Sequence, residues 1–244
     1  MSRIGVVTAL ATEARALGAL PRRAESLTAL PDGTLLAISG VGYEAAARAA
    51  QALVGAGAIG LISCGLAGGL DPGLAAGAWV LPREIRSQGQ SGVSVDGAWH
   101  QHVLRSLPSM QAVATGALWS SRTPVVTVDV KRRLFTESGA VAVEMEAMAV
   151  AQIASTAAIP FLAIKVIVDT ALDVLPRAVM AVDSAGRIQA MKLAGMLLRY
   201  PNEIIALIRL ARRYGPAQRS LRAIAGVSAL HEPTTNMPTA DVHG

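Results

Sequence analysis

Apolar and polar positions follow one another along the chain in blocks that predict strands alternating with helices. Short apolar runs bounded by glycine or polar residues predict buried strands at residues 4–10, 35–39, 59–64, 77–81 and 161–168. Small-residue stretches predict helices beginning near Glu13, over residues 43–54 and over residues 148–157. This repeated alternation indicates an α/β fold, with a mostly parallel sheet flanked by helices.

The connecting segments carry weaker signals. Thr12 is a candidate N-cap for the first helix, and Pro31-Asp32-Gly33 predicts the turn of a hairpin. Residues 87–97 are polar and glycine-rich and predict a mobile loop, whereas residues 118–130 contain a further strand. We expect one domain over residues 1–225 and a disordered tail over residues 226–244.

Composition supports a compact core and excludes several classes of protein. The chain has 244 residues, of which 52% are hydrophobic, and its one cysteine excludes an internal disulfide or a multi-cysteine metal site. Cys64 lies in an apolar strand pattern, which is typical of a buried, inert thiol. No apolar run reaches the roughly 18 residues of a membrane span, and no signal peptide precedes the first strand, so we expect a cytoplasmic protein.

The net charge of +5 is concentrated near the C-terminus. The chain shows no nucleic-acid-binding motif, so no nucleic-acid partner is expected. A basic extension over about residues 187–225 contains eight cations and one acid, Glu203. These cations are Arg187, Lys192, Arg199, Arg209, Arg212, Arg213, Arg219 and Arg222. Within it, residues 202–214 form an apolar arc of about 160° with Arg209, Arg212 and Arg213 opposite. Such a helix either lies on an anionic membrane surface or packs on the domain or a second copy.

Three acids lie where α/β proteins bind ligands. Asp169 follows the apolar strand at 161–168, Glu146 opens the Ala-rich helix, and Glu13 lies just after the first strand. Gly40-Val41-Gly42 and the segment Gly65 to Gly69 each follow a strand, where a backbone without Cβ lets a ligand approach. Neither segment fits a dinucleotide fingerprint or a P-loop, and each alone is equally typical of a tight turn. Together they predict one crevice lined by acids.

Other polar residues favour plain structural roles. His100 and His102 lack a third metal ligand and indicate surface or substrate-side positions, and Lys131-Arg132-Arg133 is typical of a solvated helix turn. Ser120-Ser121 lacks a nucleophile-elbow pattern, so serine-hydrolase chemistry is not favoured. No metal site is predicted.

Five segments carry a family resemblance. They are Ile4-Gly5-Val6-Val7-Thr8-Ala9 with Glu13, Ser39-Gly40-Val41-Gly42, Gly65-Leu66-Ala67-Gly68-Gly69-Leu70, Val143-Glu144-Met145-Glu146-Ala147 and Val166-Ile167-Val168-Asp169. In this order they resemble the purine nucleoside phosphorylase and methylthioadenosine/S-adenosylhomocysteine nucleosidase superfamily, over roughly residues 3–200. The resemblance implies a three-layer α/β fold with a central mixed, partly barrel-like sheet, assembled as a homodimer.

The resemblance also implies roles for individual residues. Asp169 would donate a proton to the departing purine, and Glu13 would activate the attacking water. Glu146 would bind the ribose hydroxyls, with Met145 packed on the sugar. The further substrate-binding residues it implies are Glu144, Gly68, Gly42 and Val125. No metal or redox cofactor is needed.

Two further sequence features, one near the glycine segment and one in the C-terminal extension, indicate which nucleophile and which substrate the protein uses. Phosphorylases of this superfamily carry an Arg and a Ser or Thr where this chain has Ser63 and Leu66, so hydrolysis is favoured. Arg122 keeps phosphorolysis open. The extension resembles the hopanoid-associated branch, whose implied substrate is adenosylhopane, cleaved to adenine and ribosylhopane. Membrane contact through the C-terminal helix and a non-catalytic nucleoside- or lipid-binding role are further hypotheses.

Overall fold

The computed structural model describes residues 3–19, 27–107, 112–176, 200 and 203–233, and for residues 203–211 only the path of the main chain. The strands are β1 (Ile4–Thr8), β2 (Leu27–Ala29), β3 (Leu35–Ile38), β4 (Gly60–Gly69), β5 (Trp79–Val80), β6 (Glu84–Ser87), β7 (Gln90–Ser94), β8 (Val113–Ala114), β9 (Ala117–Ser120), β10 (Ala140–Glu144) and β11 (Phe161–Asp169). The helices are α1 (Ala11–Ala16), α2 (Tyr43–Gly55), α3 (Gly97–Ser106), α4 (Val128–Ser138), α5 (Ala147–Thr156), α7 (Glu203–Ile224) and the 3-10 helix η2 (Ser228–His231).

One mixed sheet organises these elements, and it branches at β4. The main path is β2-β3-β1-β4-β10-β9-β6-β7, while β11 pairs with β4 and continues to β5 and β8. The first half of β4 runs parallel to β1, and its last residues pair antiparallel with β10. Along its other edge β4 runs parallel to β11 through to the pair Asp169 and Gly68. The long strand β4 therefore joins the two arms of the sheet.

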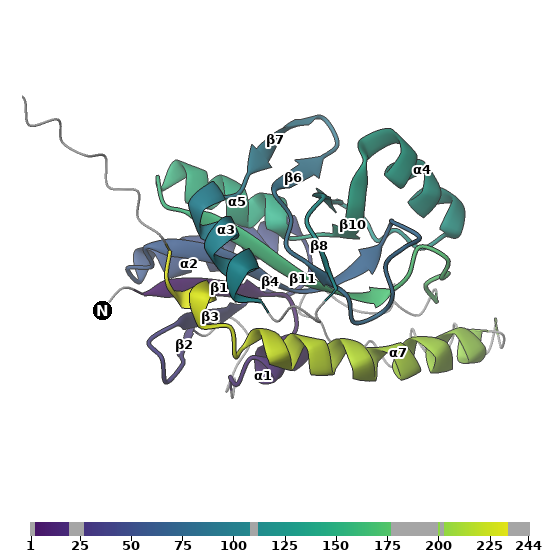
Figure 1. Ribbon diagram of the computed structural model, residues 1–244, viewed down its shortest axis with the longest axis horizontal. Helices are drawn as coiled ribbons and strands as arrows, with labels where there is room; N and C mark the ends of the chain where they lie inside the picture. The colour runs from purple at the N-terminus through teal and green to yellow at the C-terminus, as the bar shows by residue number, and fades with distance from the viewer. Residues whose placement is uncertain (1–2, 20–26, 108–111, 177–199, 201–202, 234–244) are drawn as a thin grey trace, which may run out of the picture.

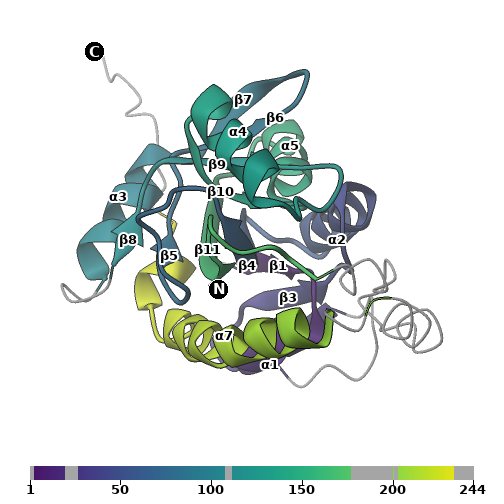
Figure 2. The ribbon, with the colours of Figure 1, turned by 90° about the vertical axis from the view of Figure 1, so that its right-hand side faces the viewer.

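Helices cover both faces of this sheet. Figure 2 shows α2 and α5 on one side, and α1 with the long helix α7 on the other. In Figure 1, α7 runs alongside the sheet past β11, against which it packs. The prediction of a three-layer α/β fold with a central mixed sheet flanked by helices is confirmed.

The glycine segment after Cys64 is not a turn, which corrects the sequence-based interpretation. Residues 65–69 continue strand β4, because their main-chain groups pair with β10 and β11. Side chains from neighbouring elements fill the space that side chains at these glycines would occupy. A Cβ at Gly65 would lie 2.8 Å from Oε1 of Glu13, and one at Gly68 would lie 3.1 Å from Oδ2 of Asp169. Glycine in this strand thus makes room for two carboxylates.

The predicted loop at residues 87–97 is also wrong, because most of it forms a hairpin. Strands β6 and β7 pair antiparallel, and Gly89 adopts a φ of +68° in the tight turn between them. Polar residues face solvent on such a two-stranded ribbon, so its composition resembles that of a loop.

The first helix begins differently from the prediction. Its N-cap is Leu10, and the capping acceptor is the Glu13 side chain, which receives N–H groups from Ala9 and Leu10. Thr12 instead lies inside the helix, where its hydroxyl accepts a hydrogen bond from Tyr214 of α7 at 2.7 Å. Glu13 therefore lies at a fixed place in the first turn of α1.

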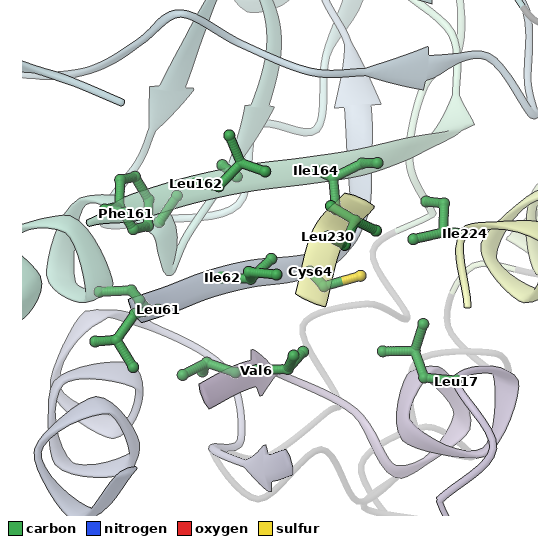
Figure 3. Packing of buried hydrophobic residues seen from close by; sticks show 14 of the residues in the cluster. Val6, Leu17, Leu61, Ile62, Cys64, Phe161, Leu162, Ile164, Ile224 and Leu230 are labelled. Atoms are coloured by element: carbon green, nitrogen blue, oxygen red, sulfur yellow. The ribbon is translucent and has the colours of Figure 1, made fainter. Parts of the chain in front are cut away.

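The C-terminal elements complete the core. Figure 3 shows Ile224 of α7 and Leu230 packed with Leu17, Cys64 and Ile164 between the sheet and α1. The expected tail is wrong for residues 226–233, since η2 buries Ala229 and Leu230 against this core. Residues 234–244 lie outside the described residues, and the single domain stays a prediction, with η2 included in its core.

Candidate active site

Glu13 is a buried carboxylate held by main-chain donors. The residue is 3% exposed, and Oε2 accepts N–H groups from Ala9 at 3.0 Å and Leu10 at 2.9 Å. Oε1 accepts the N–H of Leu66 at 2.9 Å, so the acid bridges α1 and β4. Burial raises the pKa of Glu13, although these hydrogen bonds and Lys165 oppose the rise. A carboxylate offers about four acceptor positions, so one remains for a ligand.

A buried cation lies beside this acid. Lys165 is 3% exposed in the centre of β11, and its Nζ lies 3.0 Å from Oε2 of Glu144 and donates to Ser63 Oγ at 2.9 Å. Burial lowers the pKa of Lys165, but the carboxylates of Glu144, Glu146 and Glu13 outweigh it and raise the pKa overall. Lys165 is therefore the internal counter-ion of the three glutamates.

Glu144 holds the start of helix α5. Its carboxylate accepts the N–H of Glu146 at 3.0 Å and that of Ala147 at 2.9 Å, in addition to the Lys165 contact. These are helix N-terminal donors, which a carboxylate stabilises through both hydrogen bonding and the helix dipole. Glu144, predicted as a substrate-binding residue, is thus occupied by protein groups.

Glu146 is the N-cap residue of α5, and its carboxylate is held by main-chain donors from two segments. Oε1 accepts the N–H of Gly42 at 2.8 Å, and Oε2 accepts the N–H of Met145 at 3.2 Å. Gly42 has a φ of +98°, a conformation that L side chains rarely adopt. Burial raises the pKa of Glu146 to about 7, and the nearby Glu144 carboxylate adds to the rise, whereas Lys165 opposes it.

Asp169 at the end of β11 is paired with a lysine from the basic run in α4. Lys131 is 0% exposed, and its Nζ contacts Oδ2 of Asp169 and donates to the carbonyl oxygen of Thr170 at 2.7 Å. The prediction of a solvated turn at Lys131-Arg132-Arg133 is therefore wrong for Lys131. Burial raises the pKa of Asp169, while Lys131 and then Arg213 oppose the rise.

The loop after Asp169 is tied to the C-terminal helix. Arg213 forms an ion pair with Asp173, whose carboxylate also accepts the N–H of Thr170 at 2.8 Å. The basic face predicted for α7 is thus wrong at Arg213, which is half-buried and points toward this loop. The side chains of residues 203–211, which belong to the segment predicted to carry the apolar arc, lie outside the described residues, as do Arg187, Lys192 and Arg199.

Three other predicted residues make contacts that do not include the acid side chains of the cluster. Val125 lines a separate cleft of about 680 Å³ between the β6–β7 hairpin, Trp119 and α4, whose lining does not include the acids. Arg122 stacks on Tyr43 at 4.1 Å and lies 3.6 Å from Glu44. His100, expected at the surface or on the substrate side, is buried in α3 against the carbonyl oxygen of Leu81 at 3.0 Å.

The structure therefore gathers Glu13, Glu144 and Glu146 around Lys165, and places Asp169 beside Gly68, further along strand β4. Sequence reasoning did not single out Lys165. Its signal in the sequence is that it is the single charged residue inside the apolar run at 161–168. In the described part of the chain, no three His, Cys, Asp or Glu side chains are grouped to hold a metal ion. No described helix is long and apolar enough to cross a membrane.

The layered fold and the acids held along β4 define an enzyme of the nucleosidase and phosphorylase class. Residues 3–200 match the family described as the phosphorylase superfamily. The chain belongs to this superfamily. Comparison with curated protein sequences gave no match.

Solved structures of similar fold come from the same class. The 5′-methylthioadenosine/S-adenosylhomocysteine nucleosidase of Neisseria meningitidis, in complex with methylthio-immucillin-A, is 22% identical with a TM-score of 0.68, covering 94% of this chain and 100% of that chain. The Helicobacter pylori nucleosidase with butyl-thio-DADMe-Immucillin-A is 16% identical with a TM-score of 0.67, over 93% and 98%. Futalosine hydrolase of Helicobacter pylori is 17% identical with a TM-score of 0.62, over 81% and 97%. With the family match, these neighbours support cleavage of a nucleoside N-glycosidic bond.

Proposed function

We propose that this protein hydrolyses the N-glycosidic bond of an adenosine derivative and releases adenine. The observation that carries the proposal is the set of three buried acids, Glu13, Glu146 and Asp169, each held by main-chain or ammonium donors in a fixed direction. Such preorganised acids stabilise a ribosyl centre that gains positive charge as the base leaves.

Each acid has a separate role in this proposal. Glu13 keeps one free acceptor position for water, and burial raises the pKa of this carboxyl, which makes it a stronger base toward the attacking water. Each carboxylate oxygen of Glu146 accepts one main-chain N–H. A second acceptor position on each oxygen is left for the ribose hydroxyls. Asp169, whose pKa is raised by burial, donates the proton to the leaving adenine.

Water is favoured over phosphate by the charges beside β4. The buried cluster consists of three carboxyl groups and the ammonium group of Lys165, which contacts Glu144. A phosphate dianion needs cations or free N–H donors, whereas this cluster opposes an incoming anion. Arg122, the alternative phosphate ligand, is engaged with Tyr43 and Glu44.

The direct test is adenine release from methylthioadenosine and from adenosylhopane, with and without inorganic phosphate. We expect release without phosphate, a free ribosyl product, and a loss of roughly 100-fold or more in kcat for Asp169→Asn and Glu13→Gln. The control is Asp129→Asn, since this side chain is 82% exposed in the same region. Strict phosphate dependence with a ribose 1-phosphate product would make the enzyme a phosphorylase. Unchanged release in Asp169→Asn and Glu146→Gln would overturn the catalytic roles assigned to these residues, whereas no release by wild type would favour a non-catalytic binding role.

For the 5′ substituent we propose the hopane skeleton of adenosylhopane. The resemblance to the hopanoid-associated branch suggests it, and the loop after Asp169 supports it. Leu172 and Val174 are 72% and 61% exposed, so this loop presents apolar side chains close to the acid in sequence. We expect kcat/KM to be higher for adenosylhopane than for methylthioadenosine. A preference for methylthioadenosine would contradict this assignment.

A second proposal is contact with an anionic membrane surface. Arg212, Arg219 and Arg222 of α7 are exposed and lie at spacings of seven and three residues, which places them on one helix face. Truncating α7 would open the core, so the test keeps the helix. The triple variant of these three arginines to Gln should pellet less with phosphatidylserine vesicles than wild type. Equal pelleting would contradict membrane contact.

A further inference from the structure

Lys131 is a fully buried lysine in a helix whose neighbouring cations are exposed. It lies in the first turns of α4, and its side chain is 0% exposed, whereas Arg132 and Arg133 face solvent. A lysine is rarely buried without a partner, because removing an ammonium ion from water is costly. The solubility of the helix does not account for a cation at this position.

The ammonium group of Lys131 has three protein acceptors. They are Oδ2 of Asp169, the carbonyl oxygen of Thr170 at 2.7 Å and the carbonyl oxygen of Asp173 at 3.0 Å. An ammonium group has three donors, so all of them are used. Lys131 has no donor left for a substrate, and it acts on Asp169 and on the loop that follows.

We propose that Lys131 is a positioning residue for departure of the base: it fixes the Asp169 carboxyl toward the purine and stabilises the carboxylate left after proton transfer. This role rests on the proposed function. The proton moves from Asp169 to the purine N7, and the C1′–N9 bond breaks with its electron pair remaining on the purine. The hydroxyl of water adds to C1′, and the water's other proton goes to Glu13. Lys131 stays an ammonium ion throughout.

The charges around Asp169 show how a cation affects the acidity of this carboxyl group. The groups that face it are Lys131 from α4 and Arg213 from α7, with Asp173 paired to Arg213. Lys131 is the nearer cation, because it touches the carboxylate directly. Without it, a buried carboxyl would bind its proton more tightly and become a poorer acid. An adjacent ammonium ion favours the charged product of the transfer.

The test uses two substrates that differ in their need for a proton. The cleaved adenosine derivative requires protonation of the base, whereas 4-nitrophenyl riboside releases a stable anion without it. In Lys131→Met we expect kcat on the nucleoside to fall roughly 100-fold, and kcat on the nitrophenyl riboside to change less than about threefold. The alkaline limb of the nucleoside pH–rate profile should move to higher pH, because the pKa of Asp169 rises. Arg132→Met, in the same helix, is the control and should match wild type.

The outcomes separate this role from the proposed function. If wild type releases no adenine, the function itself fails and the role of Lys131 with it. If wild type is active and Lys131→Met keeps its rate and pH profile, only the role of Lys131 is overturned. An equal loss on both substrates with an unmoved alkaline limb would also overturn it, since that is a structural defect. If Lys131→Met does not fold, Lys131→Gln, which keeps two donors but not the charge, gives the same measurements.

Discussion

The ionisation of Glu146 makes the stability of this protein depend on pH in a way that one substitution should reveal. The residue is 7% exposed, and its pKa is raised from 4.5 to about 7, first by burial and then by Glu144. Replacing it by Gln keeps an acceptor for the N–H of Gly42 but removes the titration. The informative quantity is the difference in free energy of unfolding between Glu146→Gln and wild type across this pH range.

The size of this difference in free energy of unfolding follows from the shift in the pKa of Glu146. A pKa that is raised in the folded state means that the folded protein binds more protons than the unfolded chain between the two pKa values. The stability from protonated Glu146 is complete below pH 4.5 and is lost as pH rises through about 7. At about 1.36 kcal/mol per unit, the loss is about 3 kcal/mol. Because Gln does not titrate, the variant should gain about 3 kcal/mol relative to wild type between about pH 4 and pH 8.

Urea unfolding followed by tryptophan fluorescence at several pH values measures this difference. The variant also leaves the N–H of Met145 facing an amide group, which costs about 1 kcal/mol at every pH and does not alter the trend. The control is Glu44→Gln, whose side chain is 77% exposed and should give a constant difference. A constant difference for Glu146→Gln as well would refute the reasoning.

Three further predictions concern the buried acids and the strands that hold them. Lys165→Met leaves Glu144 buried without its cation, so the free energy of unfolding should fall by about 3–5 kcal/mol in urea titrations, and a loss below about 1 kcal/mol would contradict the ion pair. Gly68→Ala places a Cβ 3.1 Å from the Asp169 carboxylate, so kcat for adenine release should fall at least about tenfold as the acid is displaced, while Gly55→Ala, which meets nothing within 4 Å, should not change it. Cys64 is 2% exposed with a pKa raised to about 12, so a chromogenic disulfide reagent should label it only after denaturation; rapid labelling of native protein would show that the strand opens.

The positions of the acids can be predicted from the sequence, whereas their partners cannot. Asp169 is predictable because a carboxylate at the end of a buried parallel strand lies where ligands bind, and Glu146 because it opens a helix after a strand. Lys165 is visible as the one charge within the apolar run, but its partners Ser63 and Glu144 lie on other strands. Which acid meets which cation depends on strand order, which a single sequence does not encode locally.

Two predictions fail for a common physical reason, since both rest on local composition. A three-residue basic run is typical of a solvated turn, yet its first member, Lys131, points inward, because neighbouring residues on a helix differ by about 100° in direction. The glycines of β4 are typical of a turn, because glycine weakens strands in general. Here tertiary pairing and the two carboxylates that occupy the vacant Cβ positions override that local preference.

The packing of α7 and η2 into the core beside the sheet has a consequence for the order of events during synthesis. Val6 leaves the ribosome early, yet the core that covers it includes Ile224 and Leu230, more than 200 residues later. Until the chain has been translated through η2, the apolar face of the sheet on the side of α1 lacks part of its cover. A nascent chain of this length exposes a surface that chaperones and other nascent chains bind. We therefore expect this face of the sheet to be fully covered only after the C-terminal elements have been synthesised.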